Sequence, residues 1–313
     1  MTETDRPNPL RTTFAGITLE TPTVLASGIL GVTASTLAFA ARAGAGAVTV
    51  KTCGLEPRKG HPGPSILPFR HGMLNAVGLS NPGVDVVADE IREYRRRNRV
   101  PVFASIFGRT EDEFGAVAAR IAVAAPDLIE VNVSCPNVQS EFGQLFGTDE
   151  RAVARITEIV KAAADKIPVS IKLTLSCPSV ARMAQVCKDH GADAVTAINT
   201  VGPGMIIDVH TGHPVLSNLE GGLSGGAILP LAVRAVYRIK AAVDIPVIGT
   251  GGVEDLDGAL QMLLAGADAV GIGTGLYTSG SGLFEELRGG LRTDLAERGL
   301  TSINELRGLA HGA

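Results

Sequence analysis

The chain has 313 residues, of which 45% are hydrophobic and 19% are charged, so it can bury one large core or two modest ones. Its 28 basic residues are balanced by 32 acidic ones, and the formal charge of −4 argues against a nucleic-acid-binding role.

Two features argue against export and membrane insertion. Residues Met1–Pro7 are polar and acidic, unlike a secretory signal or an arginine-rich transit peptide, so a cytoplasmic location is expected. The longest apolar stretch, Ala259–Tyr277, is interrupted by Asp268 and by several glycines, which is unlike a transmembrane helix. We therefore expect no membrane span.

The spacing of cysteine and histidine argues against a bound metal. The four cysteines, at positions 53, 135, 177 and 187, form no Cys-x-x-Cys pair, so neither an iron–sulfur cluster nor a disulfide framework is expected. His210 and His213 have a spacing that occurs in metal sites, but turn-forming residues surround them. We interpret this segment as a solvated turn and predict no metal site.

Short runs rich in β-branched residues, bounded by glycine or proline, recur eight times along the chain. Each is typical of a strand buried on both faces. The runs are Pro22–Gly28, Ala47–Thr52, Val100–Phe107, Leu128–Ser134, Pro168–Thr174, Ala194–Thr200, Pro246–Gly252 and Ala269–Gly275. Alanine-rich stretches with helical spacing lie between most of them, at Thr110–Ala125, Glu150–Lys166, Val180–His190, Ala227–Val243 and Asp255–Ala265.

This alternation of strand and helix predicts a parallel sheet. Eight units in a chain of this length favour a (β/α)8 TIM barrel over an open doubly wound sheet. The segment Thr12–Pro22 is expected to form a hairpin that covers the N-terminal end of the barrel. We therefore interpret residues 1–313 as a single barrel domain.

Polar residues gather where the predicted strands end, which is where barrel enzymes carry their chemistry. Lys51 and Lys172 end strands that are otherwise apolar, so each is expected to face an anion or an electron-rich ring. The glycine-rich ends of the last two strands, Gly249–Gly252 and Gly271–Gly275, would expose backbone N–H groups. They predict a phosphate-bearing ligand.

Three connections are longer than a barrel needs: Cys53–Gly83, Cys135–Thr148 and Val201–Gly226. Long connections of this kind commonly build pockets and lids. We expect these three to form the site, with residues 138–148 as a lid.

The stretch Asn132–Asn137 places a thiol, Cys135, between amide side chains directly after a predicted strand. Such a thiol can move a proton on a planar, hydrogen-bonding ring, although a buried and inert cysteine is the alternative. Amide side chains both donate and accept hydrogen bonds. The alternating C=O and N–H groups of a pyrimidine could therefore be bound by Asn75, Asn132, Asn137 and Asn199. The alternative for each asparagine is an ordinary turn residue.

Several motifs together closely resemble the class 1 dihydroorotate dehydrogenases, from about residue 12 to residue 300. The most specific is Asn-x-Ser-Cys-Pro-Asn at 132–137, because the membrane-associated class 2 enzymes have serine as the base. The segment Ile198–Gly225 is most similar to the 1B subgroup, whose catalytic chain works with an iron–sulfur flavoprotein and NAD. The other matching segments are Lys51–Thr52, Asn75–Leu79, Lys172, Gly251–Gly252 and Gly273–Thr274.

The resemblance implies an FMN enzyme that oxidises dihydroorotate to orotate in pyrimidine synthesis. Cys135 would remove the proton from carbon 5 while hydride leaves carbon 6 for the flavin, and Lys172 would stabilise negative charge on the reduced flavin. FMN would be held by Ser27, Lys51, Thr52, Asn132, Lys172, Ile198, Gly225, Gly251, Gly252, Gly273 and Thr274. Substrate would be held by Lys51, Asn75, Ala76, Val77, Gly78, Leu79, Asn132, Asn137, Asn199 and Thr200. An iron–sulfur and FAD subunit is the implied partner, in a homodimer or a heterotetramer.

Three positions depart from the 1B pattern. Ser105 stands where asparagine is usual, Gly226 stands where proline is common, and Gly202-Pro203 alters the loop after Thr200. A flavin contact at position 105 and the identity of the electron acceptor, whether NAD through a partner, fumarate or oxygen, therefore stay open.

Two alternatives to dihydroorotate oxidation remain at this point. One is a related flavin barrel that reduces another pyrimidine or a tRNA uridine, which the missing basic surface and the absent cluster cysteines disfavour. The other is a non-redox isomerase or lyase that binds a sugar phosphate, in which Lys51 or Lys172 would form a Schiff base.

Overall fold

The computed structural model describes residues 8–133 and 146–312. Eight parallel strands close into a barrel, in the spatial order β10-β13-β14-β3-β4-β7-β8-β9. Each strand falls within one of the eight predicted runs, so the predicted (β/α)8 barrel is confirmed. The strands are β3 (Thr23–Leu25), β4 (Ala47–Thr49), β7 (Val102–Ile106), β8 (Leu128–Asn132), β9 (Val169–Leu173), β10 (Ala194–Ala197), β13 (Val247–Thr250) and β14 (Ala269–Ile272).

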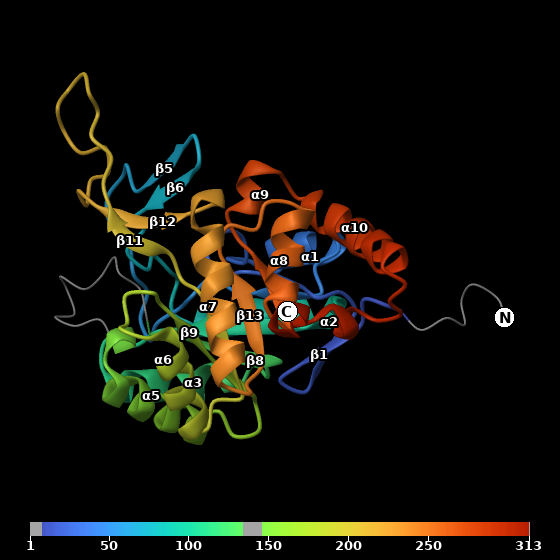
Figure 1. The fold of residues 1–313 in the computed structure, drawn as a ribbon. Helices are drawn as coiled ribbons and strands as arrows, with labels where there is room; N and C mark the ends of the chain where they lie inside the picture. Colours follow the sequence, from blue (N-terminus) through green and yellow to red (C-terminus); the bar gives the residue numbers. More distant parts are fainter. Residues whose placement is uncertain (1–7, 134–145, 313) are drawn as a thin grey trace.

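Helices surround this barrel (Figure 1). They are α1 (Ala34–Arg42), α2 (Val84–Arg97), α3 (Glu111–Ala122), α5 (Glu150–Ala163), α6 (Val180–Asp189), α7 (Leu229–Ala242), α8 (Leu256–Leu264), α9 (Gly275–Thr278), α10 (Leu283–Glu297) and α11 (Ile303–Leu306). Short 3-10 turns cover Phe146–Thr148, Gly226–Ile228 and Leu309–Gly312. Several helices begin where a side-chain oxygen accepts from an N–H of the first turn, as Asp149 does for α5 and Asp255 does for α8.

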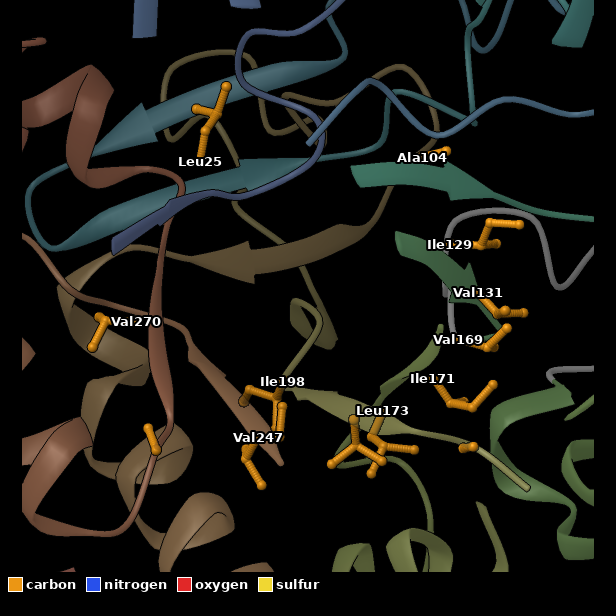
Figure 2. Close-up of a cluster of buried hydrophobic side chains, with 14 of the residues drawn as sticks. Leu25, Ala104, Ile129, Val131, Val169, Ile171, Leu173, Ile198, Val247 and Val270 are labelled. Carbon is orange, nitrogen blue, oxygen red and sulfur yellow. The ribbon is translucent and has the colours of Figure 1, made fainter. Parts of the chain in front are cut away.

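The main core lies between the barrel wall and these helices. It includes outward side chains of the strands, such as Leu25, Val131, Ile171 and Val247. Figure 2 shows members of this cluster on strands from different sides of the barrel. The continuous apolar runs of the sequence follow from this arrangement, because each strand is covered on both faces.

The N-terminal hairpin covers the end of the barrel at which the strands begin, as predicted. Strands β1 (Thr12–Phe14) and β2 (Ile17–Leu19) pair antiparallel. The side chains of Phe14 and Leu19 are fully buried in a cluster with residues at or near the starts of the barrel strands, among them Phe103. Water is therefore kept from that end, and the site must lie at the other.

A second sheet lies at the opposite end of the barrel from β1 (Figure 1). It has the order β11-β12-β6-β5 and is antiparallel, with β5 (Ile66–Phe69), β6 (Gly72–Asn75), β11 (Val201–Gly204) and β12 (Gly221–Ser224). Two of the three long connections build it. The sequence predicted only long loops there, because each strand has four residues and includes glycine or proline, and because the pairing of β6 with β12 joins segments distant in sequence.

Candidate active site

A cavity opens at the C-terminal ends of the barrel strands, beneath the second sheet. It encloses about 1120 Å³ that protein atoms do not occupy, part of it open to solvent. Barrel strands supply Lys172 and Thr250, whereas the second sheet supplies Asn75 and Ser224.

Every residue that the sequence predicted for the cofactor lines this cavity. These are Ser27, Lys51, Thr52, Asn132, Lys172, Ile198, Gly225, Gly251, Gly252, Gly273 and Thr274. The predicted substrate residues Asn75, Val77, Gly78, Leu79, Asn199 and Thr200 line it as well. One cavity thus brings together residues from nearly the whole length of the chain.

Three predicted residues stand apart from this set. Cys135 and Asn137 lie outside the described residues. Ala76 is fully buried in a cluster with Leu74 and Leu216, and it does not line the cavity. Its N–H donates to the carbonyl of Ser65 at 2.8 Å, so the predicted contact between Ala76 and substrate has no geometric support.

Lys172 lies on the floor of the cavity and forms a buried ion pair with Glu130, which does not itself line the cavity. Lys172 on β9 and Glu130 on β8 are 6% and 4% exposed, and Nζ lies 3.8 Å from Oε1. Glu130 also accepts from Ser105 Oγ at 3.1 Å and from Thr196 Oγ1 at 3.0 Å. The carboxylate therefore balances the lysine that lines the cavity. Glu130 was not predicted from the sequence, where it is one acidic residue in an apolar run.

Ser105 does not line the cavity and is fully buried. Its hydroxyl lies 2.9 Å from Thr52 Oγ1, which in turn lies 3.2 Å from Ser27 Oγ. A continuous row of hydroxyls thus joins the cavity wall to Glu130. The serine at this departure from the 1B pattern is part of an internal network beneath the wall.

An amide pair fixes another part of the wall. Asn199 Nδ2 donates to Asn132 Oδ1 at 3.1 Å, and Asn199 Oδ1 accepts from the N–H of Thr200 at 2.8 Å. These bonds set which end of the Asn199 amide faces Asn132. Both side chains are therefore held in place before a ligand binds, which suits recognition of a planar ring.

The glycines at the cavity differ in what they accommodate. A Cβ at Gly252, whose φ is +77°, would lie 2.6 Å from the backbone nitrogen of Leu229, so packing and conformation both require glycine there. A Cβ at Gly273 would lie 3.7 Å from Ala26 Cβ and 3.9 Å from Ile29 Cγ1, both ordinary contacts with the cavity wall. Glycine at 273 keeps space open in the cavity.

The three cysteines that the structure describes are buried. Burial raises the pKa of Cys53 to about 12 and also raises the pKa of Cys177 and of Cys187. None of the three lines the cavity. They are suited to packing and unsuited to proton transfer.

The residues that the structure describes contain no group of three or more His, Cys, Asp or Glu side chains able to hold a metal ion. His210 and His213 lie in an exposed turn, where Asp208 Oδ1 accepts from the N–H of His210 at 2.8 Å. Over the same ranges, 8–133 and 146–312, the helices are too short or too polar to cross a membrane.

Comparison with known proteins assigns the chain to a family. A family model described as dihydroorotate dehydrogenase matches residues 9–295. The chain belongs to the dihydroorotate dehydrogenase family. It is therefore an oxidoreductase of pyrimidine biosynthesis, which confirms the predicted enzyme class and argues against a non-redox isomerase or lyase.

Similar members of the dihydroorotate dehydrogenase family cover almost the whole chain. One from Methanothermobacter thermautotrophicus is 41% identical over 96% of this chain and 98% of its own length. One from Methanocella arvoryzae is 44% identical over 95% of this chain and 96% of its own. Both are named "Dihydroorotate dehydrogenase B (NAD(+)), catalytic subunit". The predicted similarity to the 1B subgroup is thereby confirmed.

Proposed function

We propose that the chain oxidises dihydroorotate to orotate, with FMN and substrate both held in the cavity and Cys135 as the general base. The observation that carries this proposal is the convergence of all the predicted cofactor residues on one cavity. Residues 1–313 would act as a single FMN-binding domain in the cytoplasm.

The residues present suit FMN. Gly273 leaves room that the protein does not use for its own packing, and Gly251, Gly252 and Thr274 line the same end of the cavity. Thr250 Oγ1 is buried and has no hydrogen-bond partner among the described residues, so a bound ligand would supply one. These residues would hold the phosphate and the adjoining chain of FMN, and Lys172 would lie with the ring.

The pyrimidine ring would be held by amide and ammonium groups. Asn132 and Asn199 are oriented by their own hydrogen bond, while Asn75 and Lys51 line the cavity with them. These groups would fix the ring so that the proton on carbon 5 faces the Cys135 thiolate, which removes it. The second sheet would exclude water from this step.

FMN, when bound, supplies the acceptor for the hydride that leaves carbon 6. The ammonium of Lys172 places a positive charge at the cavity floor before any reaction, and Glu130 holds it there. Preorganised charge of this kind favours the build-up of negative charge during the reaction.

The names of the relatives guide the choice of electron acceptor. Since their names include "NAD(+)" and "catalytic subunit", we propose that a partner subunit with an iron–sulfur cluster and FAD carries electrons from this chain to NAD. The assembly would be a homodimer of this chain or a heterotetramer with the partner.

The test is to mix the FMN-loaded chain with dihydroorotate in the absence of oxygen and to follow the visible absorbance of oxidised flavin. The proposal predicts that this absorbance falls after mixing, because dihydroorotate reduces the flavin. A chain that binds FMN but keeps its absorbance with dihydroorotate acts on another substrate. Turnover that requires an added NAD-linked subunit supports the proposed partner, and efficient turnover with fumarate alone refutes it.

A further inference from the structure

The row of hydroxyls beneath the cavity wall ends on a carboxylate. Ser27 Oγ, Thr52 Oγ1 and Ser105 Oγ are joined by contacts of 3.2 and 2.9 Å, and Ser105 Oγ donates to Glu130 Oε1 at 3.1 Å. Ser27 and Thr52 line the cavity, whereas Ser105 and Glu130 do not. Besides its contact with Lys172, the carboxylate is therefore connected to the cavity through three hydroxyl groups.

An ionised carboxylate can only accept hydrogen bonds, and each hydroxyl has one proton to donate. Because Ser105 donates to Glu130, it must accept from Thr52. Because Thr52 then donates to Ser105, it must accept from Ser27. The charge of Glu130 thus sets the donor-to-acceptor direction of every hydrogen bond in this row.

Two further contacts stabilise the negative charge of Glu130. Lys172 Nζ lies 3.8 Å from Oε1, and Thr196 Oγ1 donates to Oε2 at 3.0 Å. Thr196 accepts in turn from Ser170 Oγ at 3.1 Å. This second branch is buried and also ends on Glu130, but neither Ser170 nor Thr196 lines the cavity.

We propose that Glu130 and Ser105 turn Ser27 and Thr52 into hydrogen-bond acceptors toward the cavity, so that the wall selects a bound ring carrying an N–H group. With their protons committed to the row, these two hydroxyls present lone pairs to the ligand. The ring system of FMN has such an N–H, so the inference rests on the proposed function. Ser105 and Glu130 are positioning residues, since they act through Thr52.

The test measures the dissociation constant of FMN for the FMN-free chain by quenching of FMN fluorescence. Ser105→Ala removes the acceptor of the Thr52 proton, which can then face the ring N–H, and binding should weaken about tenfold, the scale of one lost hydrogen bond. Thr196→Val is the matched control. It also removes one direct donor to Glu130, but from the branch that does not reach the cavity, so the dissociation constant should stay as in the unmodified chain.

A second comparison separates proton direction from a general loosening of the barrel. In a Thr52→Val background there is no hydroxyl to orient, so adding Ser105→Ala should not change the dissociation constant further. Circular dichroism and thermal unfolding verify that each variant is folded.

Three results would overturn the inference: equal FMN binding by Ser105→Ala and the unmodified chain, equal weakening by Ser105→Ala and Thr196→Val, or a persistent effect of Ser105→Ala in the Thr52→Val background. If the unmodified chain does not bind FMN, the proposed function fails instead.

Discussion

Removal of the Lys172 ammonium should destabilise the FMN-free chain far more than removal of a typical surface cation. Lys172 and Glu130 are 6% and 4% exposed, and their charged atoms lie 3.8 Å apart. At an effective dielectric constant of about 20 their attraction is about 4 kcal/mol. Lys172→Met keeps most of the side-chain volume but leaves the Glu130 charge buried without this partner, which typically costs about 3–5 kcal/mol.

The second variant, Lys172→Met with Glu130→Gln, removes both charges and should recover most of that loss. An exposed ion pair provides the control. Arg120 Nε lies only 2.6 Å from Asp85 Oδ1, but the side chains are 55% and 63% exposed, so Arg120→Met should cost less than about 1 kcal/mol. Burial, and not distance, is expected to decide the ranking.

The assay is urea unfolding of the FMN-free chains followed by circular dichroism. A Lys172→Met chain within about 1 kcal/mol of the unmodified chain would refute the reasoning, because the charges of Lys172 and Glu130 would then be solvated. A double variant no more stable than Lys172→Met would also refute it, since the unpaired carboxylate would not be the cause.

Three further predictions concern the cavity glycine and the cysteines. Gly273→Ala should change the unfolding free energy by less than about 0.5 kcal/mol but weaken FMN binding strongly, because the added Cβ meets only the cavity wall. Gly289→Ala is the control, since a Cβ there has nothing within 4 Å, and it should bind FMN normally. Equal binding by both variants in a fluorescence titration would contradict this. Brief alkylation of the native chain under mildly alkaline conditions should modify Cys135 and spare Cys53, Cys177 and Cys187, because burial raises the thiol pKa of these three. A label that mass spectrometry maps to any of the three buried cysteines would contradict this prediction. Burial raises the Cys53 pKa from 9.0 to about 12, so between these pH values the folded state keeps a thiol proton that the unfolded state loses. The contribution of this thiol to stability is therefore complete below pH 9 and is lost as the pH rises toward 12. Urea midpoints should fall over that window less steeply in Cys53→Ala than in the unmodified chain, and identical slopes would contradict this.

The barrel and its site could be predicted because both depend on local patterns. A strand such as Ala269–Ile272 is buried on both faces, so it contains no polar side chain, and Asp268 before it and Thr274 after it mark its ends. Lys51, Lys172 and the glycine-rich ends then converge because every barrel strand ends at the same face.

What the sequence did not reveal depends on contacts between distant segments. The strand Val201–Gly204 reads Val-Gly-Pro-Gly and has no strand pattern, and it pairs only with β12. Glu130 is indistinguishable in the sequence from a solvated acidic residue, because its partners Ser105, Lys172 and Thr196 come from three other strands. Cys135 and Asn137 stay predictions from the sequence.

Reduction of the flavin by dihydroorotate in a rapid-mixing experiment without oxygen tests the central claim most directly. Cys135→Ala should bind FMN as the unmodified chain does and lose most of the rate of flavin reduction, while Cys135→Ser retains some, because a hydroxyl removes the proton less readily than a thiolate. Cys177→Ala, at a buried cysteine away from the cavity, should reduce at the normal rate. Unchanged reduction kinetics in Cys135→Ala would remove this thiol from the mechanism.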